Sequence, residues 1–197
     1  MIVILDNGHG IEVLGNCSLD GTFKEAVWAR EFTILLESKL VASGISTIRI
    51  TPEDNDVPLN ERVRRVNQIC KEHPKEKILL ISIHCNAAQV GYGNWQNARG
   101  FNAFVSFNSS QLSRRFASML QACMWRAGYK GNRAGNERGF CVSNLAICRD
   151  TICPAVLAEC LFMTNDADLA LLRDAKHVNN MAEIFFKSIE YYNHEIQ

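Results

Sequence analysis

Short apolar runs alternate with longer amphipathic segments along this chain of 197 residues. Runs of branched and aromatic residues with the length of buried strands span residues 2–5, 45–50, 78–85, 101–107, 145–149 and 155–162. Helical spacing of the apolar positions predicts helices over residues 22–43, 59–71, 111–127, 166–172 and 175–194. Because strands and helices alternate, we expect an α/β fold: a single domain whose mostly parallel, twisted sheet of about five to six strands is flanked by helices.

Capping and turn-forming residues predict where these elements begin and end. Thr22 is the expected N-cap of the first helix, and Glu25, three residues later, completes the pattern of a capping box. Gly44 is expected to end that helix. No repeat, low-complexity tract or interdomain linker interrupts residues 1–197, so one domain is expected. Polar or glycine-containing stretches predict loops over residues 52–58, 86–100 and 128–139.

Side chains that can bind a metal ion or transfer a proton lie after, or near the end of, three of the predicted strands. His9 stands in a glycine-flanked turn directly after the first strand, His84 ends the third, and Glu159 lies late in the last. In open α/β sheets, ligands gather beyond the carboxyl ends of the strands. We therefore expect these three residues to meet at one edge of the sheet.

Two imidazoles and one carboxylate are a donor set that suits a catalytic zinc ion, which keeps its fourth position open. His9, His84 and Glu25 would supply that set. Other interpretations stay open for two of them, because His84 could be a hydrogen-bonded core histidine and Glu25 only the glutamate of the capping box.

Glu159 is a carboxylate inside an otherwise apolar strand. Burial of an unpaired carboxylate is costly, so this group should have a cation, a partner or a function. Handling protons beside the metal is one interpretation, and a structural salt bridge with Arg149 or another arginine is the alternative. Asp6 is a candidate for orienting the His9 loop from behind.

Charge is balanced, with 21 basic and 21 acidic residues and a formal net charge of zero. This balance argues against bulk electrostatic binding to nucleic acid or to an anionic membrane. Arg62, Arg64 and Arg65 form a basic helix face, for which solvation is the favoured interpretation. We see no membrane span and no signal peptide, so we expect a soluble protein made in the cytoplasm.

Eight cysteines are many for a chain of this length, yet none forms a CxxC pair, so a thiolate zinc finger is not expected. Cys85 and Cys160 lie in apolar runs. We favour buried free thiols in a reducing compartment, with disulfides of a secreted protein as the alternative.

The chain resembles the zinc-dependent N-acetylmuramoyl-L-alanine amidases, of the type found in cell-separation enzymes and phage endolysins. The resemblance runs over essentially the whole chain. Matching motifs, in the family's order, are Asp6-Asn7-Gly8-His9-Gly10, Lys24-Glu25, the segment 51–67, Ser82-Ile83-His84-Cys85-Asn86, 145–149 and Pro154-Ala155-Val156-Leu157-Ala158-Glu159. Departures from the family pattern are Asn7, Pro52, Cys85 and Cys160-Leu161, and none removes a ligand.

That resemblance implies one catalytic amidase domain over residues 1–197, with His9, Glu25 and His84 as ligands of one Zn²⁺ ion and Glu159 as the catalytic glutamate. Asn86 and Arg149 stand in the matching motifs and are candidate substrate-binding residues. The implied partner is peptidoglycan, cleaved between N-acetylmuramic acid and L-alanine. Such a protein would reach the cell wall by release or by another route of export.

Other functions stay open from the residues alone. Another zinc amide hydrolase, such as a peptidase or a sugar deacetylase, could use the same ligands. A non-catalytic module that binds the cell wall is the third possibility.

Overall fold

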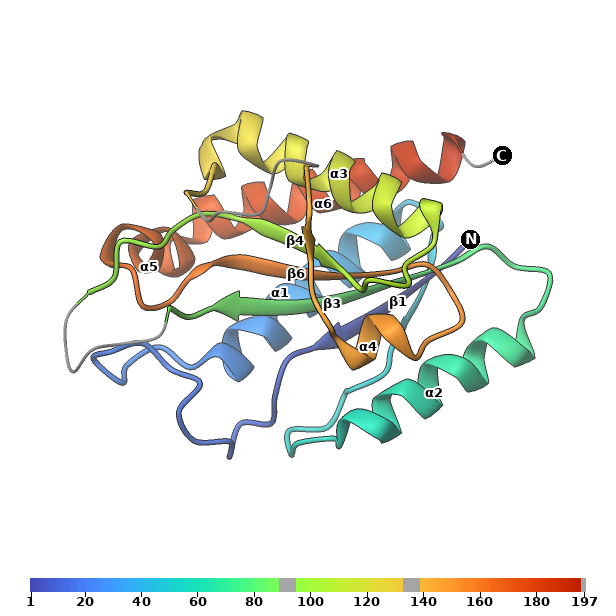
Figure 1. Cartoon of the computed structure of the whole chain (residues 1–197), viewed down its shortest axis with the longest axis horizontal. Helices are drawn as coiled ribbons and strands as arrows, with labels where there is room; N and C mark the ends of the chain where they lie inside the picture. Colours follow the sequence, from blue (N-terminus) through green and yellow to red (C-terminus); the bar gives the residue numbers. More distant parts are fainter. Residues whose placement is uncertain (89–94, 133–138, 196–197) are drawn as a thin grey trace.

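The computed structural model describes residues 1–88, 95–132 and 139–195, and its centre is one mixed sheet with strand order β2-β1-β3-β6-β4-β5 (Figure 1). The four strands β2, β1, β3 and β6 are parallel, β4 runs antiparallel to β6, and β5 is parallel to β4. The expected single-domain α/β fold with a mostly parallel sheet is therefore confirmed. The strands are β1 (Ile2–Asn7), β2 (Ser46–Arg49), β3 (Ile78–Asn86), β4 (Asn102–Val105), β5 (Cys141–Val142) and β6 (Ala155–Phe162).

Helices cover both faces of this sheet and divide the core into two apolar clusters. On one face α1, α3 and α6 pack together above side chains such as Val3 and Ile81; on the other, α2 and α4 lie over Ile4 and Leu157. The alternation of side chains along each strand produces this division. The helices are α1 (Glu25–Ala42), α2 (Leu59–Glu72), α3 (Gln111–Met124), α4 (Ala146–Arg149), α5 (Asp166–Arg173) and α6 (Ala175–Glu195), with a π-helical turn, η1 (Trp125–Tyr129), after α3.

The start of α1 differs from the prediction. Its N-cap is Lys24, with no side-chain capping bond, and Glu25 is the first helical residue. Thr22 instead donates its hydroxyl to Asp20, with Oγ1 2.8 Å from Oδ1. The predicted capping box is therefore wrong, because the Glu25 carboxylate turns toward β3 rather than back along its own helix.

The apolar run 145–149 is helical, so its prediction as a strand is wrong. The Leu145 carbonyl accepts from the backbone N–H groups of Cys148 and Arg149, which closes the turn that begins α4. Ile147 and Cys148 are buried in the cluster under α2 and α4. A short apolar run buries equally well as a strand or as a helical turn, so its pattern could not separate the two. The two-residue strand β5 was not predicted.

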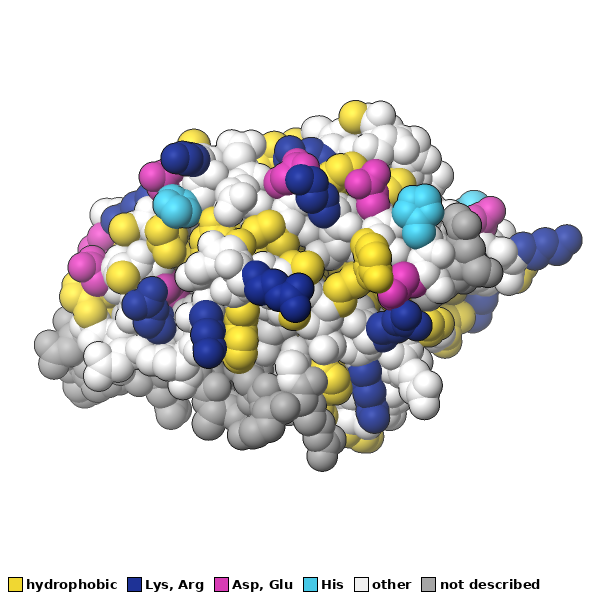
Figure 2. All heavy atoms as spheres, turned by 90° about the horizontal axis from the view of Figure 1, so that it is seen from above, with side chains coloured by type: hydrophobic (Ala, Val, Ile, Leu, Met, Phe, Trp, Pro, Cys, Tyr) yellow, Lys and Arg dark blue, Asp and Glu magenta, His cyan; other side chains and the backbone are white. Residues whose placement is uncertain are grey.

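The loops predicted over residues 86–100 and 128–139 lie partly outside the described residues, which exclude 89–94 and 133–138. Within the described part of the chain, no helix combines the length and apolar character needed to cross a membrane. On the face shown in Figure 2, basic, acidic and apolar side chains are interspersed. That face therefore presents both signs of charge, in keeping with the formal net charge of zero.

Strand register brings polar residues together on the α2 side of the sheet. Asp6 of β1 is paired with Ser82 of β3, and His84 of β3 is paired with Glu159 of β6. Paired residues of neighbouring parallel strands point to the same face, as do residues two apart in one strand. These four side chains therefore leave the sheet on one face, toward its carboxyl edge.

Candidate metal site

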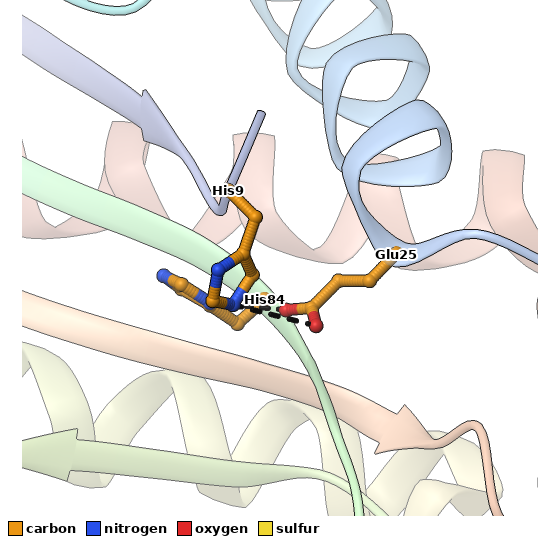
Figure 3. A group of neighbouring side chains, drawn as sticks. All are labelled: His9, Glu25 and His84. Atoms are coloured by element: carbon orange, nitrogen blue, oxygen red, sulfur yellow. Dashed lines mark hydrogen bonds and ion pairs between the residues drawn. The ribbon is translucent and has the colours of Figure 1, made fainter. Parts of the chain in front are cut away.

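His9, Glu25 and His84 come together from three separate elements (Figure 3). His9 follows β1, Glu25 opens α1 and His84 lies near the end of β3. One potential ligand atom from each lies within 4.8 Å of the other two. Glu25 Oε1 is 3.0 Å from His84 Nδ1, and Glu25 Oε2 is 3.6 Å from His9 Nε2. The three residues expected to bind a metal thus form one cluster.

The backbone around His9 is shaped to present its ring. His9 has a positive φ of 55°, which is uncommon for a residue with a side chain. Its carbonyl accepts from Arg30 Nη1 of α1 at 2.8 Å, which holds the turn against the helix. A Cβ at Gly8 would lie 2.5 Å from His84 Nδ1, so only glycine leaves room for the second imidazole.

Glu25 is buried, with 2% of its surface exposed. Its Oε1 accepts from the backbone N–H of Cys85 at 3.0 Å and also faces His84 Nδ1. Burying the charge of a carboxylate is costly unless nearby groups compensate it. The two imidazoles and this N–H compensate Glu25, and helix capping does not. Its position supports the metal-ligand interpretation over the capping-box one.

The electrostatics of the cluster depend on that carboxylate. Burial lowers the pKa of His84, but hydrogen bonding and ion pairing with Glu25 outweigh it and raise this pKa to about 9. For His9, burial is the largest influence and lowers the pKa, although Glu25 acts in the opposite direction. A proton on His84 balances the buried charge of Glu25, and a divalent cation held by the same side chains would balance it too.

The donor set itself fits zinc. Zinc binds imidazole nitrogen and carboxylate oxygen, and catalytic sites use three such ligands with one position left open. His9 keeps 35% of its side chain exposed, so the cluster is reachable from solvent. These residues could therefore hold a zinc ion with access for a substrate.

A series of polar contacts begins at the ring nitrogen of His84 that does not face Glu25. Ser82 Oγ is 3.2 Å from His84 Nε2 and 2.6 Å from Asp6 Oδ2. Arg62 donates from Nη1 to Asp6 Oδ1 at 2.9 Å and from Nη2 to Asp56 Oδ1 at 3.0 Å. Asp6, expected behind the His9 loop, thus contacts the strand that carries His84.

Arg62 was expected on a solvated basic face, and that prediction is wrong for this residue. It is 5% exposed, on the same side of α2 as the fully buried Val66. Arg64 and Arg65 instead pair with Glu61 near the surface. Helical spacing could have predicted the burial of Arg62, since Arg62 and the apolar Val66 are one turn apart. Ser82 was also missed as a supporting residue, because a serine in an apolar strand carries no distinct pattern.

A cavity of about 240 Å³ opens beside His9 and His84. Its polar floor includes Asp6, Arg62 and Ser82. The apolar part of its lining consists of Val57, Leu59, Leu145, Ala146, Ile147 and Leu157. The segment mistaken for a strand is therefore one wall of this cavity, and α2 provides the other.

The remaining candidates lie around the cluster rather than in it. Glu159 is half-buried and paired in register with His84. Asn86 is 7% exposed at a β-bulge, where its carbonyl accepts from the Met163 N–H at 2.9 Å. Arg149 pairs with Asp150, with Nη2 2.5 Å from Oδ2, and lines a different hollow. Contact of Asn86 and Arg149 with a substrate stays a prediction.

All eight cysteines are free thiols in the structure. Cys85 and Cys160, expected in the core, are buried, as are Cys141 and Cys148. The other four are partly exposed.

The fold and the cluster define an α/β protein with a candidate metal site at the carboxyl edge of its sheet. Residues 3–191 match the sequence profile of the family described as N-acetylmuramoyl-L-alanine amidase. The chain belongs to this family, which confirms the resemblance drawn from the motifs.

Two curated relatives come from a Bacillus phage and from Bacillus subtilis. The chain is 27% identical over 184 residues to an endolysin of Bacillus phage SPP1, covering 92% of this chain and 62% of the relative. It is 25% identical over 194 residues to the N-acetylmuramoyl-L-alanine amidase LytC of Bacillus subtilis (strain 168), covering 96% and 35%. The chain thus spans less than two thirds of either relative.

Solved structures share the fold over nearly the whole chain. The N-acetylmuramyl-L-alanine amidase Ami1 of Mycobacterium smegmatis superposes with a TM-score of 0.83 at 21% identity, covering 98% of this chain and 96% of that one. An N-acetylmuramoyl-L-alanine amidase of Clostridium difficile 630 gives 0.82 at 22% identity, with the same coverage. The architecture of the chain is therefore that of these amidases.

Proposed function

We propose that this chain hydrolyses the amide bond between N-acetylmuramic acid and L-alanine in peptidoglycan, using one zinc ion. The observation that carries the proposal is the meeting of His9, Glu25 and His84 within 4.8 Å, beside an open cavity. Family membership and the names of the endolysin and LytC relatives supply the substrate class.

In this proposal His9, Glu25 and His84 hold the ion. Glu25 is positioned for it by the Cys85 N–H, and the glycine at position 8 leaves room for the His84 ring. When bound, zinc would act as a Lewis acid that lowers the pKa of water and polarises a carbonyl oxygen. The chain's own part is to fix the three donors and to keep one side of the cluster open.

Glu159 is proposed to move the proton. Its ionised carboxylate accepts a proton from the attacking water and returns it to the leaving nitrogen of L-alanine, so that the C–N bond breaks once the C–O bond has formed. Register supports this role, because His84 and Glu159 are paired and point to the same face of the sheet. Glu159 is also only half-buried.

The cavity would seat the groups on either side of the scissile bond. Its apolar walls, formed by the start of α2 and by α4, exclude water from the reacting amide. Asn86 and Arg149 are candidate contacts for parts of the glycan or the stem peptide that lie farther from the scissile bond.

Product analysis tests the proposal. Purified chain is incubated with zinc and isolated peptidoglycan, and the soluble products are read by mass spectrometry. New amino-terminal L-alanine without new reducing sugar or free acetate is the expected result. New termini inside the stem peptide would show a peptidase, acetate would show a deacetylase, and binding without cleavage would show a wall-binding module.

A further inference from the structure

The ring nitrogen of His84 that faces away from Glu25 has a defined partner. His84 Nε2 lies 3.2 Å from Ser82 Oγ, which lies 2.6 Å from Asp6 Oδ2. The other oxygen of Asp6, Oδ1, accepts from Arg62 Nη1 at 2.9 Å. Two side chains, Ser82 and Asp6, therefore connect the imidazole to the buried Arg62.

The chemistry of these groups fixes the direction of the hydrogen bonds. Asp6 paired with Arg62 is a carboxylate and can only accept. The single hydroxyl hydrogen of Ser82 therefore goes to Asp6, and Ser82 must accept from His84. With a metal ion held between His84 and Glu25, a neutral His84 would then carry its hydrogen on Nε2, and the lone pair of Nδ1, the nitrogen that faces Glu25, would be available to the ion.

We propose that Ser82, Asp6 and Arg62 are positioning residues that fix His84 in the tautomer whose Nδ1 can bind the metal ion. This inference rests on the proposed function, since it takes His84 as a ligand. It goes beyond that proposal by naming the groups that set the ring's tautomer and orientation.

Burial and register make the network rigid. Ser82, Asp6 and Arg62 are all 5% exposed or less. Asp6 and Ser82 are paired across β1 and β3, so strand pairing sets the spacing of their side chains. Arg62 also donates to two carbonyls, those of Asn7 and Val57, at 2.6 and 2.7 Å. The guanidinium therefore cannot turn away from Asp6 without breaking several buried hydrogen bonds.

The tautomer can be read without any substitution. In ¹⁵N-edited NMR spectra of the zinc-loaded protein, His84 is expected to carry its hydrogen on Nε2. A hydrogen on Nδ1, in a protein that holds zinc, would overturn the inference and leave the proposed function standing.

Substitution gives a second measurement. Ser82→Ala should weaken zinc binding by about 10- to 100-fold in a chelator competition. Ser82→Thr keeps the hydroxyl and should recover most of the affinity, which a merely space-filling role for Ser82 would not explain. Ser188→Ala on α6 removes another buried serine hydroxyl, away from the site, and should leave zinc binding unchanged.

The outcomes separate the two proposals. Zinc affinity unchanged by Ser82→Ala and by Asp6→Asn would overturn the positioning role alone. Failure of the unaltered protein to bind zinc would overturn the metal site, and the positioning role with it.

Discussion

At the scale of single residues, the site depends on one carboxylate placed between two imidazoles. Glu25 is held by the Cys85 N–H and faces both rings, at 3.0 and 3.6 Å. Glu159 approaches the same edge from the neighbouring strand without belonging to the cluster. This separation supports the proposal of different tasks for the two carboxylates: Glu25 would hold the metal ion and Glu159 would handle protons.

Glu159→Gln should keep zinc and lose turnover. The amide has nearly the shape of the carboxylate but cannot accept the proton of water, so a loss of roughly 10²- to 10⁴-fold in kcat is expected. Release of peptidoglycan fragments and bound zinc are measured on the same preparation. Glu31→Gln, an exposed position on α1, is the matched control. Substantial hydrolysis by Glu159→Gln would refute the assigned role.

Gly8→Ala should weaken zinc binding by roughly tenfold or more, because a displaced ligand loses its alignment. The added Cβ would lie 2.5 Å from His84 Nδ1, so the ring must move. Gly15→Ala in the same loop adds a methyl group to open space, at a positive φ that Gly8 does not have. Zinc binding retained by Gly15→Ala would therefore isolate the steric effect of the Cβ at position 8. Equal zinc affinity for both variants would contradict the steric argument.

At the scale of elements, α2 serves both the site and the surface. On its inner side, Arg62 forms an ion pair with Asp6. On its outer side, Glu61 forms ion pairs with Arg64 and Arg65. The first turn also forms a cavity wall with Leu59. A change in the anchoring of this helix is therefore expected to reach the candidate site.

The outer ion pairs predict a pH dependence. Hydrogen bonds from Arg64 and Arg65 lower the pKa of Glu61 from 4.5 to about 2. Since the folded-state pKa is depressed, this stabilisation is present above about pH 4.5 and is lost as the pH falls toward 2. Glu61→Gln should lower Tm at neutral pH by a small amount, because the pair is exposed, and the difference should vanish in acid.

Thermal unfolding of both proteins across that pH range checks this prediction. Glu31→Gln, which lacks these arginine partners, should parallel the unaltered protein throughout. A difference for Glu61→Gln that is constant with pH would show that the ion pairs are not its cause.

At the scale of the whole molecule, the candidate metal site joins elements that are distant in sequence. Its residues come from the first turn, the first helix and the third strand. An ion held there would cross-link β1, α1 and β3, and would therefore stabilise the folded state.

Zinc removal should lower Tm and abolish hydrolysis, and added zinc should restore both. At free zinc 100-fold above Kd, the stabilisation is about 2.7 kcal/mol if the unfolded chain does not bind the ion. Scanning calorimetry with a chelator, and then with excess zinc, measures it. His84→Ala should show no zinc-dependent shift. An identical Tm with and without zinc in the unaltered protein would contradict the metal site.

Much of the fold could be predicted from local patterns. The apolar runs that became β1, β3 and β6 are continuous because helices cover both faces of the sheet, and such runs are distinctive. The prediction of a strand over residues 145–149 was wrong because five mostly apolar residues fit a strand and a helical turn equally well. The strand β5 was not predicted because a run of two residues is too short to show a periodic pattern.

The candidate site could be predicted in its residues but not in its geometry. The sequence determined that His9, His84 and Glu159 would gather at one edge, because parallel strands end together there. Only the tertiary structure decided that Glu25 turns from its own helix to β3, and that Arg62 and Ser82 are buried behind His84. The physical reason is that strand order follows from local pattern and connectivity, whereas the direction of a polar side chain depends on partners supplied by other elements.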